Sequence, residues 1–343
     1  MRNRIICALA VSAILTGGLV AAQSKKARLN PVIDLLSQGR PVFGLYAPSN
    51  RRPGGRGGPG APGAPGGAPA TPAPPPAPDK PASDLAKEAV AYKNSDFVFD
   101  GSMEGGLDRS LPAFTAFVAG MKDAGALMKS PLRFTHPLIV KTPESDTPTL
   151  HADIATQLNL GVSGLMLPKA ESAEQVRQAI AAMRFKSKGG TRPDAVGDAP
   201  AYWGLSEAEY KQRADVWPLN PDGELINWTI VESKEGLAHV REIAAVKGIG
   251  VLWPGAGTLR GVFSTTSASG ERVFDEKAWE GAIQQVLSAC KEFKVACGFP
   301  ANANDIEMRM KQGFSVFVMN WGDPGFKALE AGRKIANRPL TNE

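Results

Sequence analysis

DIATQLNLGVSGLMLPKAESAEQVRQAIAAMRF, the stretch from Asp153 to Phe185, decides the fold. It predicts the end of an amphipathic helix, a turn at Gly161, a buried strand over Gly164–Leu167 and a second helix. Ser172 is a suitable N-cap for that helix, because its hydroxyl can accept a backbone N–H of the first turn, where Glu174 adds an acidic residue. A short apolar strand between two helices is typical of a parallel sheet whose strands are buried on both faces. The stretch therefore indicates an α/β fold.

The same alternation continues along the chain after a short capping helix over Pro31–Gln38. Strands are predicted at Pro41–Tyr46, Asp96–Met103, Leu138–Thr142, Gly164–Leu167, Trp228–Glu232, Gly250–Trp253, Val295–Phe299 and Ser315–Asn320. Helices are predicted at Ser83–Tyr92, Ser110–Met128, Thr149–Leu158, Ala173–Met183, Glu235–Val246, Asp275–Phe293, Asp305–Gln312 and Pro324–Ala336. Eight strands, each followed by a helix, fit a (β/α)8 TIM barrel. An open doubly wound sheet is the alternative, but Gly255-Ala-Gly257 supplies only the first two glycines of a dinucleotide fingerprint.

Two segments interrupt the globular pattern. Residues 1–22 have a basic start, an apolar run and a small-residue end, which predicts a secretory signal peptide and an exported protein, periplasmic or extracellular. An uncleaved anchor is the alternative; once the leader is cleaved, we expect no membrane span. Residues 51–81 are dominated by Gly, Pro and Ala, so we expect a disordered insertion after the first strand. The barrel then comprises residues 30–50 and 82–338.

The composition is that of an ordinary globular protein, with 43% hydrophobic and 21% charged residues. The net charge of +5 falls to +3 without Arg2 and Arg4 of the leader, and no basic cluster with interleaved aromatics is present, so we expect no nucleic-acid partner. Cys290 and Cys297 remain after the leader is removed. We favour two buried thiols over a disulfide, which an oxidising compartment would permit. No Cys/His cluster has the spacing of a zinc site.

In a (β/α)8 barrel the active site is built at the carboxyl ends of the strands. The predicted strand exits carry Asp100, Glu104, Lys141, Lys169 and Glu232. Gly255 to Thr258 follow the sixth strand, Asn302 the seventh and Asn320 the eighth. Glu232 ends an apolar strand, which favours an inward-facing metal ligand; the alternative is a cap for the helix that starts near it.

The stretch that opens this subsection also resembles a known family. Gly161-Val-Ser-Gly-Leu-Met-Leu-Pro168, Glu171-Ser-Ala-Glu174 and the run that ends at Gly190-Thr-Arg192 are similar to the signature of the HpcH/HpaI aldolase and citrate lyase family. Lys186 and Ser187 stand where that family has two prolines. The resemblance implies a barrel of the pyruvate/phosphoenolpyruvate-binding type, a homo-oligomer in which the last helix is exchanged, and a small 2-oxo acid as substrate.

The resemblance also implies a divalent metal, Mg²⁺ or Mn²⁺, held by a Glu and an Asp, together with a substrate Arg and a catalytic His. Glu232 matches the metal Glu, but Thr258 stands at the Asp position, Lys141 at the Arg position, and Met103 or Gly105 at the His position. Because one carboxylate holds Mg²⁺ only weakly unless substrate and water add oxygens, we expect a weakly bound metal.

Three hypotheses follow. The first is a divergent lyase or aldolase, in which Glu232 binds the metal, Lys141 the substrate carboxylate, and Glu104 or Asp100 accepts a proton; Lys169, Gly255 and Ala256 complete the substrate site. In the second, Lys141 or Lys169 forms a Schiff base with the substrate. In the third, the exported barrel has lost catalysis and binds small acids or an envelope partner.

Overall fold

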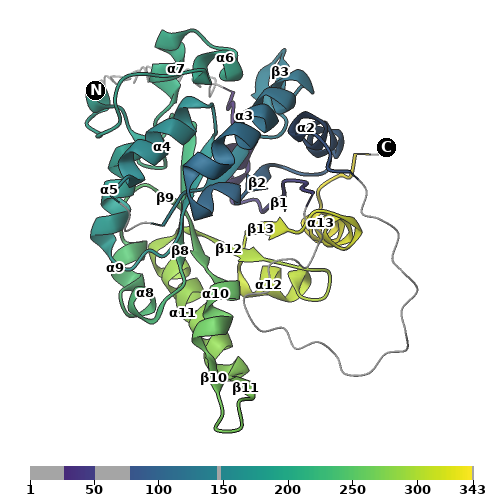
Figure 1. The fold of residues 1–343 in the computed structure, drawn as a ribbon, viewed down its shortest axis with the longest axis vertical. Helices are drawn as coiled ribbons and strands as arrows, with labels where there is room; N and C mark the ends of the chain where they lie inside the picture. The colour runs from purple at the N-terminus through teal and green to yellow at the C-terminus, as the bar shows by residue number, and fades with distance from the viewer. Residues whose placement is uncertain (1–26, 51–77, 145–147, 342–343) are drawn as a thin grey trace, which may run out of the picture.

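The protein, described here from a computed structural model for residues 27–50, 78–144 and 148–341, forms a closed barrel of eight parallel strands (Figure 1). The strands are β1 (Val42–Tyr46), β2 (Val98–Asp100), β5 (Leu138–Lys141), β6 (Gly164–Leu167), β8 (Leu225–Val231), β9 (Ile249–Pro254), β12 (Ala296–Pro300) and β13 (Val316–Met319). They follow one another in that order, and β13 pairs with β1 to close the sheet. The predicted (β/α)8 barrel is therefore confirmed.

Helices surround the barrel (Figure 1). They are α2 (Ala82–Ala91), α3 (Leu107–Asp123), α4 (Leu150–Asn159), α5 (Ala173–Met183), α8 (Lys234–Ala238), α9 (Val240–Ala244), α11 (Glu276–Phe293), α12 (Ile306–Gln312) and α13 (Asp323–Ile335), preceded by α1 (Pro31–Ser37). At the start of α5, Ser172 and Gln175 form a reciprocal capping box, as the sequence predicted for Ser172. The α13 helix packs on its own barrel, where Gly332 lies against the Phe43 ring. Exchange of this helix between subunits stays a prediction.

One predicted helix has different bounds, and two connections contain short elements that the sequence did not predict. The predicted helix Ser110–Met128 ends at Asp123, because Gly125 has a positive φ of 85°, and Leu127–Lys129 forms β3, paired with β4 (Leu132–Phe134). The long connection before β8 contains η2 (Lys186–Lys188), α6 (Ala199–Trp203), α7 (Glu207–Arg213) and β7 (Val216–Trp217). After β9 come α10 (Ala256–Val262) and a projecting hairpin of β10 (Ser264–Thr266) and β11 (Arg272–Phe274) (Figure 1). One or two residues in each turn determine where these short elements begin and end. The periodic pattern of hydrophobic residues does not reveal them.

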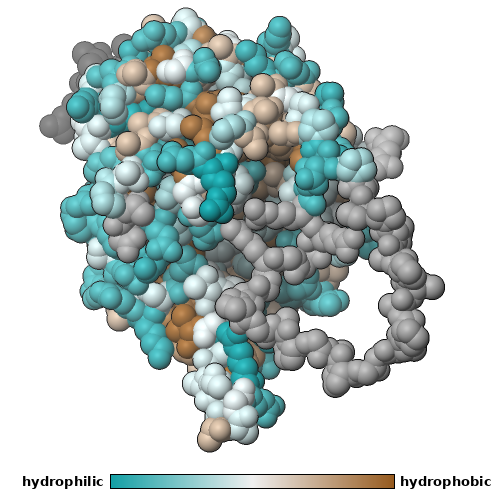
Figure 2. All heavy atoms as spheres, in the orientation of Figure 1, coloured by the Kyte–Doolittle hydropathy of each residue, from teal (hydrophilic) through white to brown (hydrophobic). Residues whose placement is uncertain are grey.

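The predicted leader, residues 1–22, and most of the predicted insertion, residues 51–77, lie outside the described residues; Pro78–Pro81 are exposed and form neither helix nor strand. Within the described part of the chain, no helix is both long enough and apolar enough to cross a bilayer. The face in Figure 2 is mostly polar, with hydrophobic residues in small separate groups.

Aromatic side chains fill the barrel interior. The Trp228 ring stacks on Trp253, with centroids 5.6 Å apart, and on Phe99, with centroids 6.1 Å apart. Room for Trp253 comes from Gly298, where an added Cβ would lie 1.9 Å from the Trp253 ring. Because Phe99, Trp228 and Trp253 are at most 6% exposed, they form an apolar floor beneath the mouth of the barrel.

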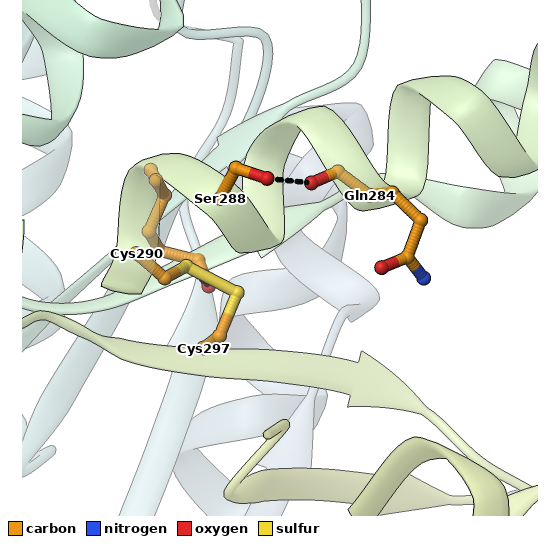
Figure 3. The surroundings of a disulfide bond; sticks show 5 residues. Gln284, Ser288, Cys290 and Cys297 are labelled. Atoms are coloured by element: carbon orange, nitrogen blue, oxygen red, sulfur yellow. Dashed lines mark hydrogen bonds between the residues drawn. A yellow bond between two sulfur atoms is a disulfide. The ribbon is translucent and has the colours of Figure 1, made fainter. Parts of the chain in front are cut away.

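Cys290 at the end of α11 and Cys297 in β12 are joined in a disulfide (Figure 3). Their Cα atoms are 5.7 Å apart, within the range that a disulfide spans. Both residues are 2% exposed. The predicted burial was right, but the preference for free thiols was wrong, because the turn between helix and strand brings the two Cα atoms within bonding reach.

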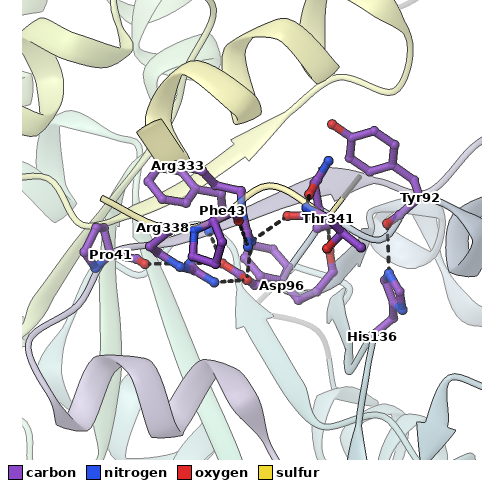
Figure 4. A network of polar contacts seen from close by, with 12 residues as sticks. Pro41, Phe43, Tyr92, Asp96, His136, Arg333, Arg338 and Thr341 are labelled. Atoms are coloured by element: carbon purple, nitrogen blue, oxygen red, sulfur yellow. Dashed lines mark hydrogen bonds and ion pairs between the residues drawn. The ribbon is translucent and has the colours of Figure 1, made fainter. Parts of the chain in front are cut away.

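A buried ion network attaches the C-terminal tail to the amino-terminal end of the barrel strands (Figure 4). Arg338 binds both carboxylate oxygens of Asp96, and Arg333 donates to Asp96 Oδ1 at 3.1 Å. Asp96 Oδ2 also accepts the backbone N–H of Phe43 at 2.9 Å. Since these three charged residues are no more than 9% exposed, the network is shielded from water and ties the tail to β1 and to the segment before β2.

Next to this network, burial lowers the pKa of His136 from 6.5 to about 4. The neutral ring fits its site, because Nε2 donates to the Tyr92 carbonyl and Nδ1 accepts from the Thr135 hydroxyl. In the unfolded chain His136 takes up a proton below about pH 6.5, whereas in the folded protein its ring stays neutral down to about pH 4. The folded state should therefore lose about 3 kcal/mol of stability as the pH falls from 6.5 to 4.

Urea unfolding at several pH values between 7 and 4 checks this expectation. His136→Asn should flatten the pH dependence, although it lowers stability at pH 7 by removing the Tyr92 hydrogen bond. His151→Gln, at an exposed position of α4, is the matched control. An unchanged slope in His136→Asn would contradict the assignment.

Candidate active site

Glu232 lies at the mouth of the barrel and faces inward. Along β8, Ile226, Trp228 and Ile230 pack in the barrel interior, whereas Leu225 and Val231 pack against the helices. Because successive side chains of a strand alternate between faces, Glu232 continues the interior series. The cap alternative is wrong, since Ser233 rather than Glu232 is the N-cap of α8.

The Glu232 carboxylate is held between the exits of β6 and β9. Its Oε1 accepts the backbone N–H of Lys169 at 2.9 Å. On the other side lies Gly255, where an added Cβ would lie 2.4 Å from Glu232 Cβ and 2.7 Å from Oε2. Glu232 is 7% exposed, and among the described residues no Lys, Arg or His forms an ion pair with it. A buried, uncompensated carboxylate is costly, and such groups are frequent at functional sites.

Lys141 also faces the interior, at the end of β5. Ile139 packs inside the barrel, and Leu138 and Val140 pack outside it, so Lys141 continues the interior series. Its Nζ lies 2.5 Å from Glu104 Oε1 in η1 (Ser102–Gly105), and its side chain is 14% exposed. The structure therefore brings together Lys141 and Glu104, to which the first hypothesis assigned substrate binding and proton transfer.

The other predicted residues divide between the site and its surroundings. Asp100 faces outward, because Val98 packs outside the barrel and Phe99 inside it. Its Oδ1 accepts the Ser102 N–H at 2.7 Å. The geometry therefore favours Glu104 over Asp100 as proton acceptor. The backbone of Lys169 contacts Glu232, and its Nζ lies 3.6 Å from Glu144 Oε2. Ala256 is buried and its carbonyl accepts the Trp279 indole N–H at 2.9 Å, which anchors the loop after β9.

Beside the Lys141–Glu104 pair lies a hollow of about 590 Å³, lined by Glu104, Asp108, Arg109, Glu144 and Asp153 among others. Its lining does not include Glu232 or Gly255. Glu144 connects this hollow with the surroundings of Glu232, because it lines the hollow and also pairs with Lys169. Sequence reasoning missed Glu144, which follows a proline in a loop and carries no periodic signal. It also missed Tyr46, which the alternation Val42, Gly44, Tyr46 could have identified as interior.

At the two positions where the family resemblance implies a Glu and an Asp, the chain offers a metal ion one carboxylate, that of Glu232. Thr258 is exposed on α10, at the position where an Asp was expected. Within the described ranges, no group of three His, Cys, Asp or Glu side chains is placed to hold a metal. The Glu232 carboxylate fits a divalent cation when oxygens of substrate and water complete the coordination of the ion.

The fold and the site together define a (β/α)8 barrel with an inward carboxylate at its catalytic mouth. A family model described as HpcH/HpaI aldolase/citrate lyase matches residues 123–325. The chain therefore belongs to the HpcH/HpaI aldolase/citrate lyase family.

Relatives agree with this assignment. A hydroxypyruvate/pyruvate aldolase of Delftia acidovorans is 33% identical over 174 residues, which cover 49% of this chain and 55% of that protein. One of Deinococcus radiodurans is 34% identical over 117 residues, which cover 32% and 36%. The matches thus span about half or less of these relatives. A crystal structure of a family member from Burkholderia cenocepacia is similar with a TM-score of 0.61 at 19% identity, covering 90% of this chain and 98% of that one, which shows the fold.

Proposed function

We propose that the protein is a carbon–carbon lyase of the aldolase type that acts on a small 2-oxo acid. The observation that carries the proposal is Glu232, a buried carboxylate with no ion-pair partner in the described residues, directed into the mouth of the barrel. Family membership supports lyase chemistry, and the names of the two curated relatives support hydroxypyruvate or pyruvate as the substrate type.

In this proposal each residue has a defined task. Lys141 binds the carboxylate of the 2-oxo acid, though without the bidentate fork of an arginine. In the cleavage direction the hydroxyl proton of the aldol passes to Glu104, the carbon–carbon bond breaks, an aldehyde leaves and the electron pair remains as a pyruvate enolate. A divalent cation on Glu232 would stabilise the negative charge of that enolate. The apolar floor of Phe99, Trp228 and Trp253 limits water beneath the reacting atoms.

A Schiff-base mechanism is less consistent with the geometry. Glu104 lies 2.5 Å from the Lys141 ammonium and Glu144 lies 3.6 Å from that of Lys169. A carboxylate partner stabilises the ammonium form, which is not a nucleophile. The second candidate function is a non-catalytic barrel that binds small acids, which the replacement of the metal Asp by Thr258 favours.

An assay of 4-hydroxy-2-oxo acid cleavage, with pyruvate formation coupled to lactate dehydrogenase, tests the proposed function. We expect pyruvate release that EDTA reduces at least about tenfold and that Mg²⁺ or Mn²⁺ restores, because the enolate charge needs a cation. Release that EDTA does not affect would contradict the metal role. No release under any condition, with pyruvate binding detected by calorimetry, would favour the binding barrel.

We also propose that the protein is exported. The leader that motivates export lies outside the described residues, but the Cys290–Cys297 disulfide supports an oxidising compartment. A homo-oligomer likewise remains a proposal, and size-exclusion chromatography with light scattering tests it.

A further inference from the structure

Lys169 has an unusual backbone conformation at the mouth of the barrel. Three non-glycine residues of the described chain have a positive φ: Lys169 at 50°, Lys294 at 56° and Asn337 at 52°. Lys294 directly follows α11 and Asn337 lies two residues after α13, positions where a left-handed residue commonly ends a helix. Lys169 instead follows Pro168 at the exit of β6, so helix termination does not account for its conformation.

The left-handed turn points the backbone N–H groups of Lys169 and Ala170 toward the end of β8. The Lys169 N–H donates to Glu232 Oε1 and the Ala170 N–H donates to the Ile230 carbonyl, both at 2.9 Å. His239 in turn lies 2.9 Å from the Glu171 carbonyl through Nδ1, which fixes the following residue of the loop. The loop after β6 is thereby attached to the strand exit that carries Glu232.

Within the described part of the chain, the Lys169 amide is the hydrogen-bond donor found on the Glu232 carboxylate. On its opposite side Gly255 brings only backbone close to the carboxylate, and burial leaves 7% of Glu232 exposed. A hydrogen bond from a backbone amide to an ionised carboxylate is among the stronger ones in proteins. Loss of the hydrogen bond from the Lys169 N–H would let the Glu232 carboxylate rotate away from its inward position.

The Lys169 ammonium and the Glu144 carboxylate form an exposed ion pair. Its side chain is 40% exposed, its partner Glu144 is 56% exposed, and their charged atoms are 3.6 Å apart. Exposed ion pairs of this kind contribute little.

From these contacts we propose that Lys169 is a positioning residue: its left-handed main chain, rather than its charge, holds the Glu232 carboxylate in the orientation needed to bind a cation and a 2-oxo acid. The catalytic part of this inference rests on the proposed function.

Amide hydrogen exchange tests the contact independently of activity. In Glu232→Ala, exchange of the Lys169 amide should become at least about tenfold faster, because its acceptor is lost, whereas the Leu165 amide within β6 should not change. Unchanged exchange at Lys169 would overturn the proposal.

Kinetics of three variants then separate backbone from charge. Lys169→Asn keeps the amide and tolerates the left-handed conformation, so its kcat should be at least about tenfold higher than that of Lys169→Val. Lys169→Val is β-branched and disfavours that conformation, so kcat should fall at least about thirtyfold, with KM changed less than about threefold. Lys294→Val imposes the same strain far from Glu232 and should lower the melting temperature without changing kcat.

Two outcomes would overturn the proposal: a loss of kcat in Lys169→Asn as large as in Lys169→Val, which would assign the effect to the ammonium, or an equal loss in Lys294→Val, which would assign it to general strain. If wild-type protein cleaves no 2-oxo acid while the exchange result holds, the proposed function and its catalytic consequence fall, and the amide–carboxylate contact stands.

Discussion

Glu232→Gln is expected to lower kcat/KM for 2-oxo acid cleavage by about 10³-fold, the magnitude typical of losing one preorganised electrostatic group. Glutamine keeps the size of the side chain and an oxygen that can accept the Lys169 N–H. It removes the negative charge that would hold a cation. Steady-state kinetics at saturating Mg²⁺ measures the effect.

The Glu232→Gln variant should lose activity without losing thermal stability. Since Glu232 is buried and has no ion-pair partner among the described residues, removing its charge should leave the melting temperature unchanged or raise it. Glu235→Gln, at an exposed position in the first turn of α8, is the matched control and should keep full activity. A Glu232→Gln enzyme within a few-fold of wild-type activity would contradict the assigned role.

Asp96→Asn should destabilise the fold by about 3–5 kcal/mol, the cost of leaving buried charges without their partner. The substitution keeps the shape of the side chain but leaves the guanidinium groups of Arg333 and Arg338 without a counter-ion in a shielded site. Urea unfolding at pH 7 measures the loss. We expect the C-terminal tail to become sensitive to proteolysis before the barrel unfolds, because Arg338 no longer holds it.

An exposed ion pair provides the control for Asp96. Glu292→Ala removes the partner of Arg241, whose side chain is 71% exposed, and should cost less than about 1 kcal/mol. Comparable losses in Asp96→Asn and Glu292→Ala would show that the buried network contributes no more than a surface contact.

Much of the barrel could be predicted from local patterns. The strand Gly164–Leu167 and the helix Ala173–Met183 have the bounds that the sequence predicted, because a fully apolar run and a capping box mark them. The hairpin of β3 and β4 and the break at His239 between α8 and α9 were not predicted. These features depend on single turn residues and on packing between elements, which periodicity does not report.

The sequence could predict which residues lie near the candidate site, but not how their side chains contact one another. Strand exits and the family signature identified Glu232, Lys141, Glu104 and Lys169, since a parallel barrel always collects these ends at one face. The sequence did not indicate that Lys141 pairs with Glu104, or that Asp100 faces outward.

By itself, the sequence determined the barrel and the carboxylate at the end of the fifth barrel strand, because hydrophobic period and strand order are local properties of the chain. Only the tertiary structure decided the disulfide, the Asp96 network and the contact of the Lys169 amide with Glu232. Those features join residues from different strands and helices, and closure of the barrel is what brings them within bonding distance.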